Sequence, residues 1–160
     1  LNALYYGVAL QLAVYMGQTL KKMQEEYPDK TVVPAAMLYY RTQDPLISVE
    51  EILTPEKYEE KIFSKLKNTG AVSSRAGIVE ALDSEFTRFS SVVPVSKVQG
   101  AVEEKGNVYN PVILNQILDY AGKKAMSLAE EIVSGKIEVS PTVIGETDSC
   151  KYCAYKGVCG

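Results

Sequence analysis

Hydrophobic residues recur with a helical period near both ends of the chain. From Ala3 to about Tyr27 apolar residues return at spacings of three and four, and Asn2 is suited to cap this helix. A second long helix is predicted from the Asn110-Pro111 pair to Ser134, because proline favours the first helical position and Gly135 favours an end. Its apolar positions form a broad stripe that we expect to be buried, consisting of Leu114, Ile117, Leu118, Ala121, Ala125, Leu128 and Ile132.

The pattern between these helices is mixed. Residues 31–42 are β-branched, aromatic and apolar on both faces, which predicts a buried strand, although Pro34 limits hydrogen bonding near its start. Thr54-Pro55-Glu56 predicts the start of a helix that Gly70 ends. A short helix over 74–82, a strand over about 89–97 and an extended segment over 137–144 complete the pattern. This order of helices and strands predicts an α+β or α/β fold.

Length, charge and hydropathy narrow the class of protein. The 160 residues are 46% hydrophobic, enough for one core, and we expect a single domain over 1–160. The net charge of −3 means that any contact with DNA must be local, since nucleic-acid-binding domains are normally basic. No apolar run approaches the ~20 residues that span a bilayer, so we expect no membrane contact. The helical pattern begins almost at Leu1, which suggests that further protein lies upstream.

The three cysteines lie within the last eleven residues, as Cys150, Cys153 and Cys159. Such a bunched group does not form a disulfide framework, so a reducing cytoplasm is the expected setting. Two thiolates separated by two residues, with a third five residues later, are typical of iron–sulfur and zinc sites. Those sites usually have four protein ligands, and the chain has no histidine. Either the fourth ligand comes from elsewhere or the cysteines bind no metal.

Gln11 and Tyr15 lie four residues apart on the first predicted helix and therefore share a face. The amide and the hydroxyl can each donate and accept a hydrogen bond, so together they can hold a phosphate or a neighbouring carboxylate. From spacing alone, the simpler interpretation is that Tyr15 is a core residue and Gln11 a solvated one. The isolated acids Asp83, Glu85 and Asp119 are expected to face solvent, and no acid-x-lysine strand is present.

Three landmarks occur in one order along the chain: the Leu10-Gln11-Leu12-x-x-Tyr15 segment, the tyrosine-rich segment 34–40, and the Cys150-x-x-Cys153-x-Tyr-Lys-x-x-Cys159 tail. Together they resemble the C-terminal part of the nuclease domain found in the AddB (RexB) family of bacterial AddAB helicase–nuclease subunits. This domain belongs to the RecB-like branch of the PD-(D/E)XK nucleases, so the resemblance implies helices packed on a small mixed sheet.

The resemblance also implies roles for particular residues. Gln11 and Tyr15 would assist substrate binding beside the metal site. Cys150, Cys153 and Cys159 would be three ligands of a 4Fe-4S cluster, with the fourth cysteine far upstream. The Gly-x-x-Asp-Arg-x-Asp and Asp-Tyr-Lys motifs that bind Mg²⁺ and activate water would also lie upstream. The chain would then comprise residues 1–146 of nuclease domain and a cluster-binding tail over 147–160, structural and DNA-positioning but not catalytic by itself.

The parent protein implied by this resemblance is a cytoplasmic, metal-dependent deoxyribonuclease that acts in DNA double-strand-break repair with an AddA-type helicase–nuclease subunit. A competing interpretation is a zinc- or cluster-stabilised binding module unrelated to nucleases. A third is a redox protein that uses Cys150 and Cys153, but redox pairs normally open a helix early in a βαβ unit, whereas this pair is terminal.

Overall fold

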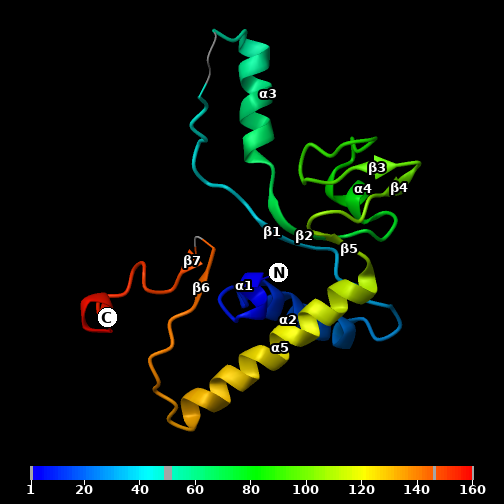
Figure 1. Ribbon diagram of the computed structural model, residues 1–160. Coiled ribbons are helices and arrows are strands. Elements are labelled where there is room, and N and C mark those ends of the chain that lie inside the picture. The colour runs from blue at the N-terminus through cyan, green and yellow to red at the C-terminus, as the bar shows by residue number, and fades with distance from the viewer. Residues whose placement is uncertain (1, 49–51, 146, 160) are drawn as a thin grey trace. The chain divides into compact units, whose positions relative to one another are not determined.

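A computed structural model describes residues 2–48, 52–145 and 147–159, and they divide into two compact units (Figure 1). The first unit is Leu1–Thr19 with Ile117–Gly160, and the second is Leu20–Gln116. Elements of the first unit are α1 (Asn2–Tyr5), the start of α2 (Gln11–Glu26), most of α5 (Pro111–Val133), β6 (Val143–Ile144), β7 (Thr147–Asp148) and α6 (Lys156–Cys159). Elements that lie wholly in the second unit are β1 (Ala36–Tyr39), α3 (Pro55–Leu66), β2 (Thr69–Ser73), α4 (Ile78–Leu82), β3 (Lys97–Val98), β4 (Ala101–Val102) and β5 (Val108–Tyr109).

A small mixed sheet organises the second unit. Strand β2 is central, antiparallel to β1 and parallel to β5, and α4 packs against it. The register pairs Tyr39 with Thr69 at one end of the β1–β2 ladder and Ala36 with Val72 at the other. The core beside this sheet is apolar and consists of Val72, Val79, Phe86, Val93, Val95 and Val108. The expected mixed α+β architecture, with helices on a small mixed sheet, is confirmed.

The long helix at the C-terminal side is confirmed almost residue for residue. Asn110 Oδ1 accepts a hydrogen bond from the Ile113 amide at 3.0 Å, which is the geometry of an N-cap. Helix α5 then runs over Pro111–Val133 and buries Leu114, Leu118 and Ala121. The stripe ends sooner than expected, because Ile132 is 75% exposed. The predicted helix start at Thr54 is also confirmed, since Thr54 Oγ1 accepts from the Lys57 amide at 3.5 Å.

The predicted continuous helix from Ala3 to Tyr27 is wrong. Helix α1 ends at Tyr5, and Gly7 follows in the left-handed region with φ +82°. The Gly7 amide donates to the Leu4 carbonyl and the Val8 amide to the Ala3 carbonyl, at 3.0 and 2.8 Å. This pair of bonds is the Schellman termination, which glycine favours. Asn2 accordingly lies inside α1 rather than capping a long helix.

Two predictions about the sheet also fail. The strand expected over 31–42 is only Ala36–Tyr39, and the buried Pro34 just before it has no amide proton to donate to a ladder. Gly70 does not end the preceding helix, since α3 stops at Leu66 and Gly70 lies inside β2 with φ +139°. A Cβ at this position would collide with the Met37 carbonyl oxygen, so a glycine is required where the two strands approach.

The segment expected to be a strand over 89–97 is mostly a loop, with one isolated bridge between Phe89 and Ser96. Asp83 explains the loop: its carboxylate accepts from Ser90 Oγ at 2.7 Å and from the Ser91 amide at 2.9 Å. Asp83 was expected to face solvent, and instead it is buried, with 6% of its surface exposed. The expected helix over 74–82 is shorter, Ile78–Leu82, and the extended 137–144 segment contributes only β6.

Replacing Gly7 with alanine should destabilise the first unit. A left-handed residue with a Cβ costs about 1–2 kcal/mol, and this Cβ would lie 3.0 Å from Leu128 Cδ1. Gly17→Ala is the matched control, because Gly17 is inside α2 and a Cβ there meets nothing within 4 Å. The control should instead stabilise by about 0.5–1 kcal/mol. Urea unfolding of both variants measures the two free energies, and equal effects of the two substitutions would contradict the helix-termination argument.

Asp83 should make stability depend on pH. Its hydrogen bond from Ser90, and those from the Ser91 and Glu85 amides, hold the pKa of this carboxyl below its usual value of 3.8. A group whose pKa is lower in the folded state stabilises above the unfolded-state pKa, and this stabilisation is lost as pH falls through the folded-state pKa. Thermal unfolding should therefore show Asp83→Asn melting below the parent at pH 7, with the difference shrinking below about pH 4. A difference that is constant from pH 7 to pH 3 would show that the charge is not involved.

Candidate functional site

Gln11 and Tyr15 form a hydrogen-bonded pair at the start of α2. Gln11 Nε2 donates to the Tyr15 hydroxyl oxygen at 3.2 Å, across one turn of the helix. Gln11 is exposed, and 60% of the Tyr15 surface is exposed, so the interpretation of Tyr15 as a core residue is wrong. Within the described residues no other hydrogen bond uses the Gln11 side-chain carbonyl oxygen or the Tyr15 hydroxyl proton. The pair therefore offers one acceptor and one donor to an external group.

Aromatic contacts hold the turn that precedes this pair. The Tyr5 ring stacks on the Tyr120 ring at 5.8 Å between centroids, and Tyr6 meets Tyr5 edge-on at 5.1 Å. Tyr120 also donates its hydroxyl proton to the Tyr5 carbonyl oxygen at 2.8 Å. Because Tyr120 lies on α5, these contacts tie the α1 segment to α5 inside the first unit. The segment that leads into Gln11 is thereby held by packing as well as by the Gly7 turn.

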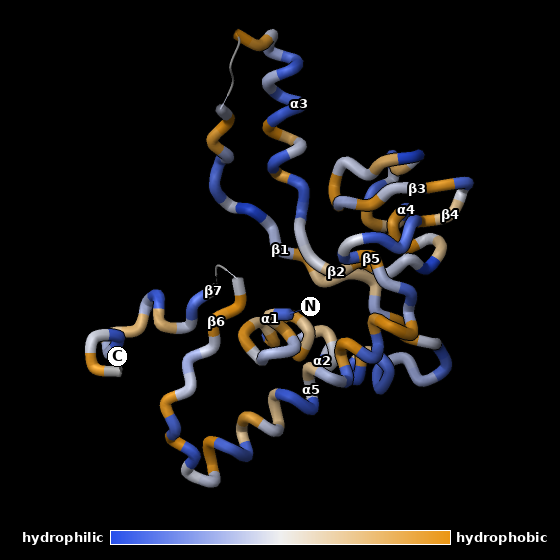
Figure 2. The backbone as a smooth tube through the Cα atoms, in the orientation of Figure 1, coloured by the Kyte–Doolittle hydropathy of each residue, from blue (hydrophilic) through white to orange (hydrophobic). Residues whose placement is uncertain are grey.

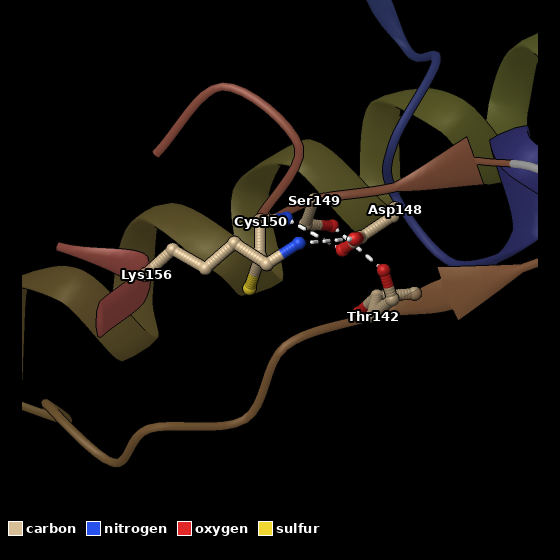
Figure 3. A network of polar contacts seen from close by, with 5 residues as sticks. All are labelled: Thr142, Asp148, Ser149, Cys150 and Lys156. Atoms are coloured by element: carbon tan, nitrogen blue, oxygen red, sulfur yellow. Dashed lines mark hydrogen bonds and ion pairs between the residues drawn. The ribbon is translucent and has the colours of Figure 1, made fainter. Parts of the chain in front are cut away.

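The cysteine tail is organised by the short β6–β7 hairpin (Figure 3). Ser149 Oγ donates to the Thr142 carbonyl oxygen at 2.8 Å, which closes the hairpin. The Asp148 carboxylate accepts from the Cys150 amide at 2.7 Å and pairs with Lys156 Nζ at 3.4 Å. The Cys150 amide is the main reason that the pKa of Asp148 is lowered, and Lys156 lowers it further. One carboxylate therefore holds both ends of the cysteine loop.

The cysteines themselves lie on a tight turn. The Cys153 amide donates to the Cys150 carbonyl oxygen at 3.1 Å, and the Tyr155 amide is directed at Cys153 Sγ at 3.4 Å. Cys150 is half-buried and Cys153 is exposed. An amide directed at a sulfur is one of the contacts that tune iron–sulfur sites. The backbone of Cys159 lies in α6, and its side chain is outside the described part of the structure.

No metal centre is assembled by the side chains that the structure describes: three potential ligands among Asp, Glu and Cys do not gather anywhere in that part of the chain. Glu85 and Asp119 are exposed, as expected of isolated acids. Two described thiols in one turn fit the soft donor set that iron–sulfur clusters and zinc prefer. The three-cysteine site of Cys150, Cys153 and Cys159 thus stays a prediction.

The structure brings together basic and aromatic side chains that the sequence pattern missed. Tyr39, Tyr40, Arg41, Lys65, Lys67 and Thr69 line one pocket in the second unit. They are scattered over 39–69, so no run of basic residues marks them in the sequence. The signal that was available is the four-residue spacing of Lys57, Lys61 and Lys65, which puts three lysines on one side of a helix.

Comparison with known proteins decides the family. Residues 2–160 match a family model described as the PD-(D/E)XK nuclease superfamily. The chain belongs to this superfamily. The match covers both the Gln11–Tyr15 pair and the cysteine tail, and it confirms the family expected from the three sequence landmarks.

Curated relatives of this superfamily member share one name, which describes the B-type subunit of an ATP-dependent helicase/deoxyribonuclease. The relative from Clostridium tetani is 32% identical over 160 residues, that from Thermoanaerobacter sp. (strain X514) 30% over 168, and that from Lachnoclostridium phytofermentans 30% over 167. These alignments cover 98–99% of the chain but only 14% of each relative. Among the described residues, no helix is both long and apolar enough to cross a membrane.

Proposed function

We propose that this chain forms the C-terminal part of the nuclease domain of a helicase/deoxyribonuclease B-type subunit that cuts DNA. Superfamily membership over residues 2–160 and the name of the relatives support this proposal. Hydrolysis of the phosphodiester bond would use water activated by Mg²⁺, and acids and a lysine outside these 160 residues would hold that ion. The chain alone would position DNA without cutting it.

The observation that carries the proposal is the Gln11–Tyr15 pair. Its hydrogen bond fixes the amide and the phenol relative to each other before any ligand binds. The remaining acceptor on Gln11 can hold a protonated or metal-bound group, and the remaining donor on Tyr15 can hold a phosphate oxygen. Such preorganised groups contribute to a reaction by positioning, where small displacements are costly. We propose that the pair orients the DNA backbone beside the metal.

Gln11→Ala in the complete protein should lower the rate of Mg²⁺-dependent degradation of linear DNA by about tenfold to a hundredfold. Tyr15→Phe should have a similar effect, because it removes the hydroxyl and keeps the ring. Gln18→Ala is the matched control: Gln18 is also exposed, lies two turns further along α2, and has no tyrosine partner among the described residues. Rates are compared after circular dichroism shows that each variant is folded.

A Gln11→Ala protein that cuts at the parent rate would contradict the positioning role. Equal losses for Gln11→Ala and Gln18→Ala would assign the effect to this side of α2 as a whole and would also contradict it. Both outcomes leave the nuclease proposal open to its own test, which is whether the complete parent protein degrades DNA when Mg²⁺ is added.

We further propose that Cys150, Cys153 and Cys159 hold a 4Fe-4S cluster whose fourth cysteine lies outside these residues. The turn that brings the Cys150 and Cys153 backbones together supports this, and so does the absence of histidine from the chain. A cluster bound here would supply folding free energy to a tail with little regular structure, because metal binding and folding are coupled. A structural zinc ion is the second candidate, since thiolates also suit zinc.

Cys153→Ser in the complete protein should remove the broad visible absorbance and the bound iron, and should lower the melting temperature. Tyr152→Ser is the matched control, because Tyr152 is 89% exposed in the same loop and carries no thiol. The isolated 160-residue chain should be colourless, because three thiolates cannot complete the coordination. A colourless complete protein with one zinc per chain would favour the zinc site, and one without metal would overturn both.

The cellular setting follows from this assignment. We propose that the parent protein works in the cytoplasm on DNA double-strand breaks, together with an AddA-type helicase–nuclease subunit. The relatives' name supports an ATP-dependent helicase and a deoxyribonuclease acting in one assembly.

A further inference from the structure

A pocket of about 340 Å³ lies in the second unit where β1 ends, β2 begins and α3 ends. The β1–β2 register places Tyr39 opposite Thr69, and the chain continues from Tyr39 into Tyr40 and Arg41. Lys65 belongs to the last turn of α3, and Lys67 follows it. Figure 1 shows the three elements meeting at this point. We call Tyr39, Tyr40, Arg41, Lys65 and Lys67 the basic groove.

The basic groove is positively charged in a chain whose net charge is −3. Three of the residues that line the pocket are cations, and none is a carboxylate. Among the described residues, Arg41, Lys65 and Lys67 form no ion pair with a carboxylate. Three cations gathered without internal partners repel one another, and an anionic ligand removes that cost. The local charge therefore indicates an anion-binding surface.

The groove also presents aromatic faces. Tyr40 is 75% exposed and Tyr39 is 55% exposed. Large aromatic side chains usually bury most of their surface, so two consecutive exposed tyrosines beside cations need a ligand with its own flat apolar faces. Unpaired nucleic-acid bases have such faces, and base–aromatic stacking is the usual partner of a cationic groove in proteins that bind single strands.

The positive charge continues along α3. Lys57, Lys61 and Lys65 lie one above another on one side of this helix, and Figure 2 shows how strongly hydrophilic α3 is. A second pocket of about 320 Å³, lined partly by Lys61, Ser64 and Lys65, shares Lys65 with the first. The two pockets and the lysine row therefore form one path that is longer than a single phosphate group requires.

We propose that the basic groove and the lysine row of α3 bind one unpaired strand of DNA. The phosphates contact Arg41, Lys65 and Lys67, a base stacks on Tyr40, and the strand continues along Lys61 and Lys57. This inference rests on the proposed function, because it takes DNA as the ligand. A single strand is favoured over a duplex because the faces of paired bases are covered by their neighbours and cannot reach a tyrosine.

Fluorescence anisotropy with a labelled oligothymidylate and the 160-residue chain tests the charge. The triple variant Arg41→Gln, Lys65→Gln, Lys67→Gln should bind about tenfold to a hundredfold more weakly at low salt. Its slope of log affinity against log salt should be shallower by about two, since each lost phosphate contact on a single strand removes about 0.7. The matched control is Lys21→Gln, Lys22→Gln, Lys105→Gln, which removes the same charge from exposed positions outside the groove. The control should keep most of the affinity.

Two substitutions at one position test the stacking. Tyr40→Ala should weaken binding about fivefold to a hundredfold, as loss of a stacked base does, whereas Tyr40→Phe should bind like the parent. In the complete protein, an oligonucleotide carrying 5-iodouracil should cross-link under ultraviolet light to the peptide that contains Tyr39 and Tyr40. This readout locates the strand even when other parts of that protein also bind DNA.

Equal losses in the two triple variants would show binding by net charge alone and would overturn the proposal. So would duplex DNA or polyglutamate competing as well as the single strand, or Tyr40→Ala binding like the parent without a cross-link to its peptide. A complete protein that binds at the groove but never degrades DNA with Mg²⁺ would contradict the nuclease function and leave the groove standing. A complete protein that degrades DNA while the groove variants bind normally would do the opposite.

Discussion

The close approach of β1 and β2 at Gly70 is the constraint on which the second unit depends. No residue with a Cβ fits there, because the Met37 carbonyl oxygen occupies that space. With glycine present, β1 pairs with β2 from Ala36 to Tyr39, and β2 then pairs with β5. The core of Val72, Val79 and Val108 forms beside this ladder. The register that follows also sets the basic groove, because it brings the end of β1 to the start of β2.

Aspartates take over where regular structure stops. Asp83 holds the loop over 83–91 through Ser90 and the Ser91 amide, and Asp148 holds the cysteine loop through the Cys150 amide and Lys156. A carboxylate can accept several hydrogen bonds at once and can therefore order a loop that lacks a ladder or a helix. In the tail this matters for function, because the cysteines need a defined backbone before a metal joins them. The same contacts lower the pKa values of both carboxyls.

The features with a proposed role in DNA binding are polar, aromatic and exposed, and they lie outside the apolar core. Gln11 and Tyr15 are joined by a hydrogen bond at the start of α2, and Tyr40 stands beside Arg41 and Lys65 in the second unit. The acidic net charge of the chain limits attraction to DNA elsewhere. A nuclease subunit that must let a strand move through it gains from contacts that are local, because weak contacts spread over the whole surface would slow the strand.

The sequence by itself determined the elements that depend on near neighbours. Helix α5 and the start of α3 were predicted because an N-cap, a proline and a helical period all act within a few residues. The spacing of Gln11, Tyr15 and the three cysteines was likewise enough to indicate the nuclease family that the comparisons confirm. Only the tertiary structure decided the break at Gly7, the existence of β2, the burial of Asp83, the exposure of Tyr15 and the basic groove. Each of these depends on a partner that the local pattern does not specify, such as Leu128 for Gly7, Met37 for Gly70 and Ser90 for Asp83, or Lys65 and Lys67 beside Arg41.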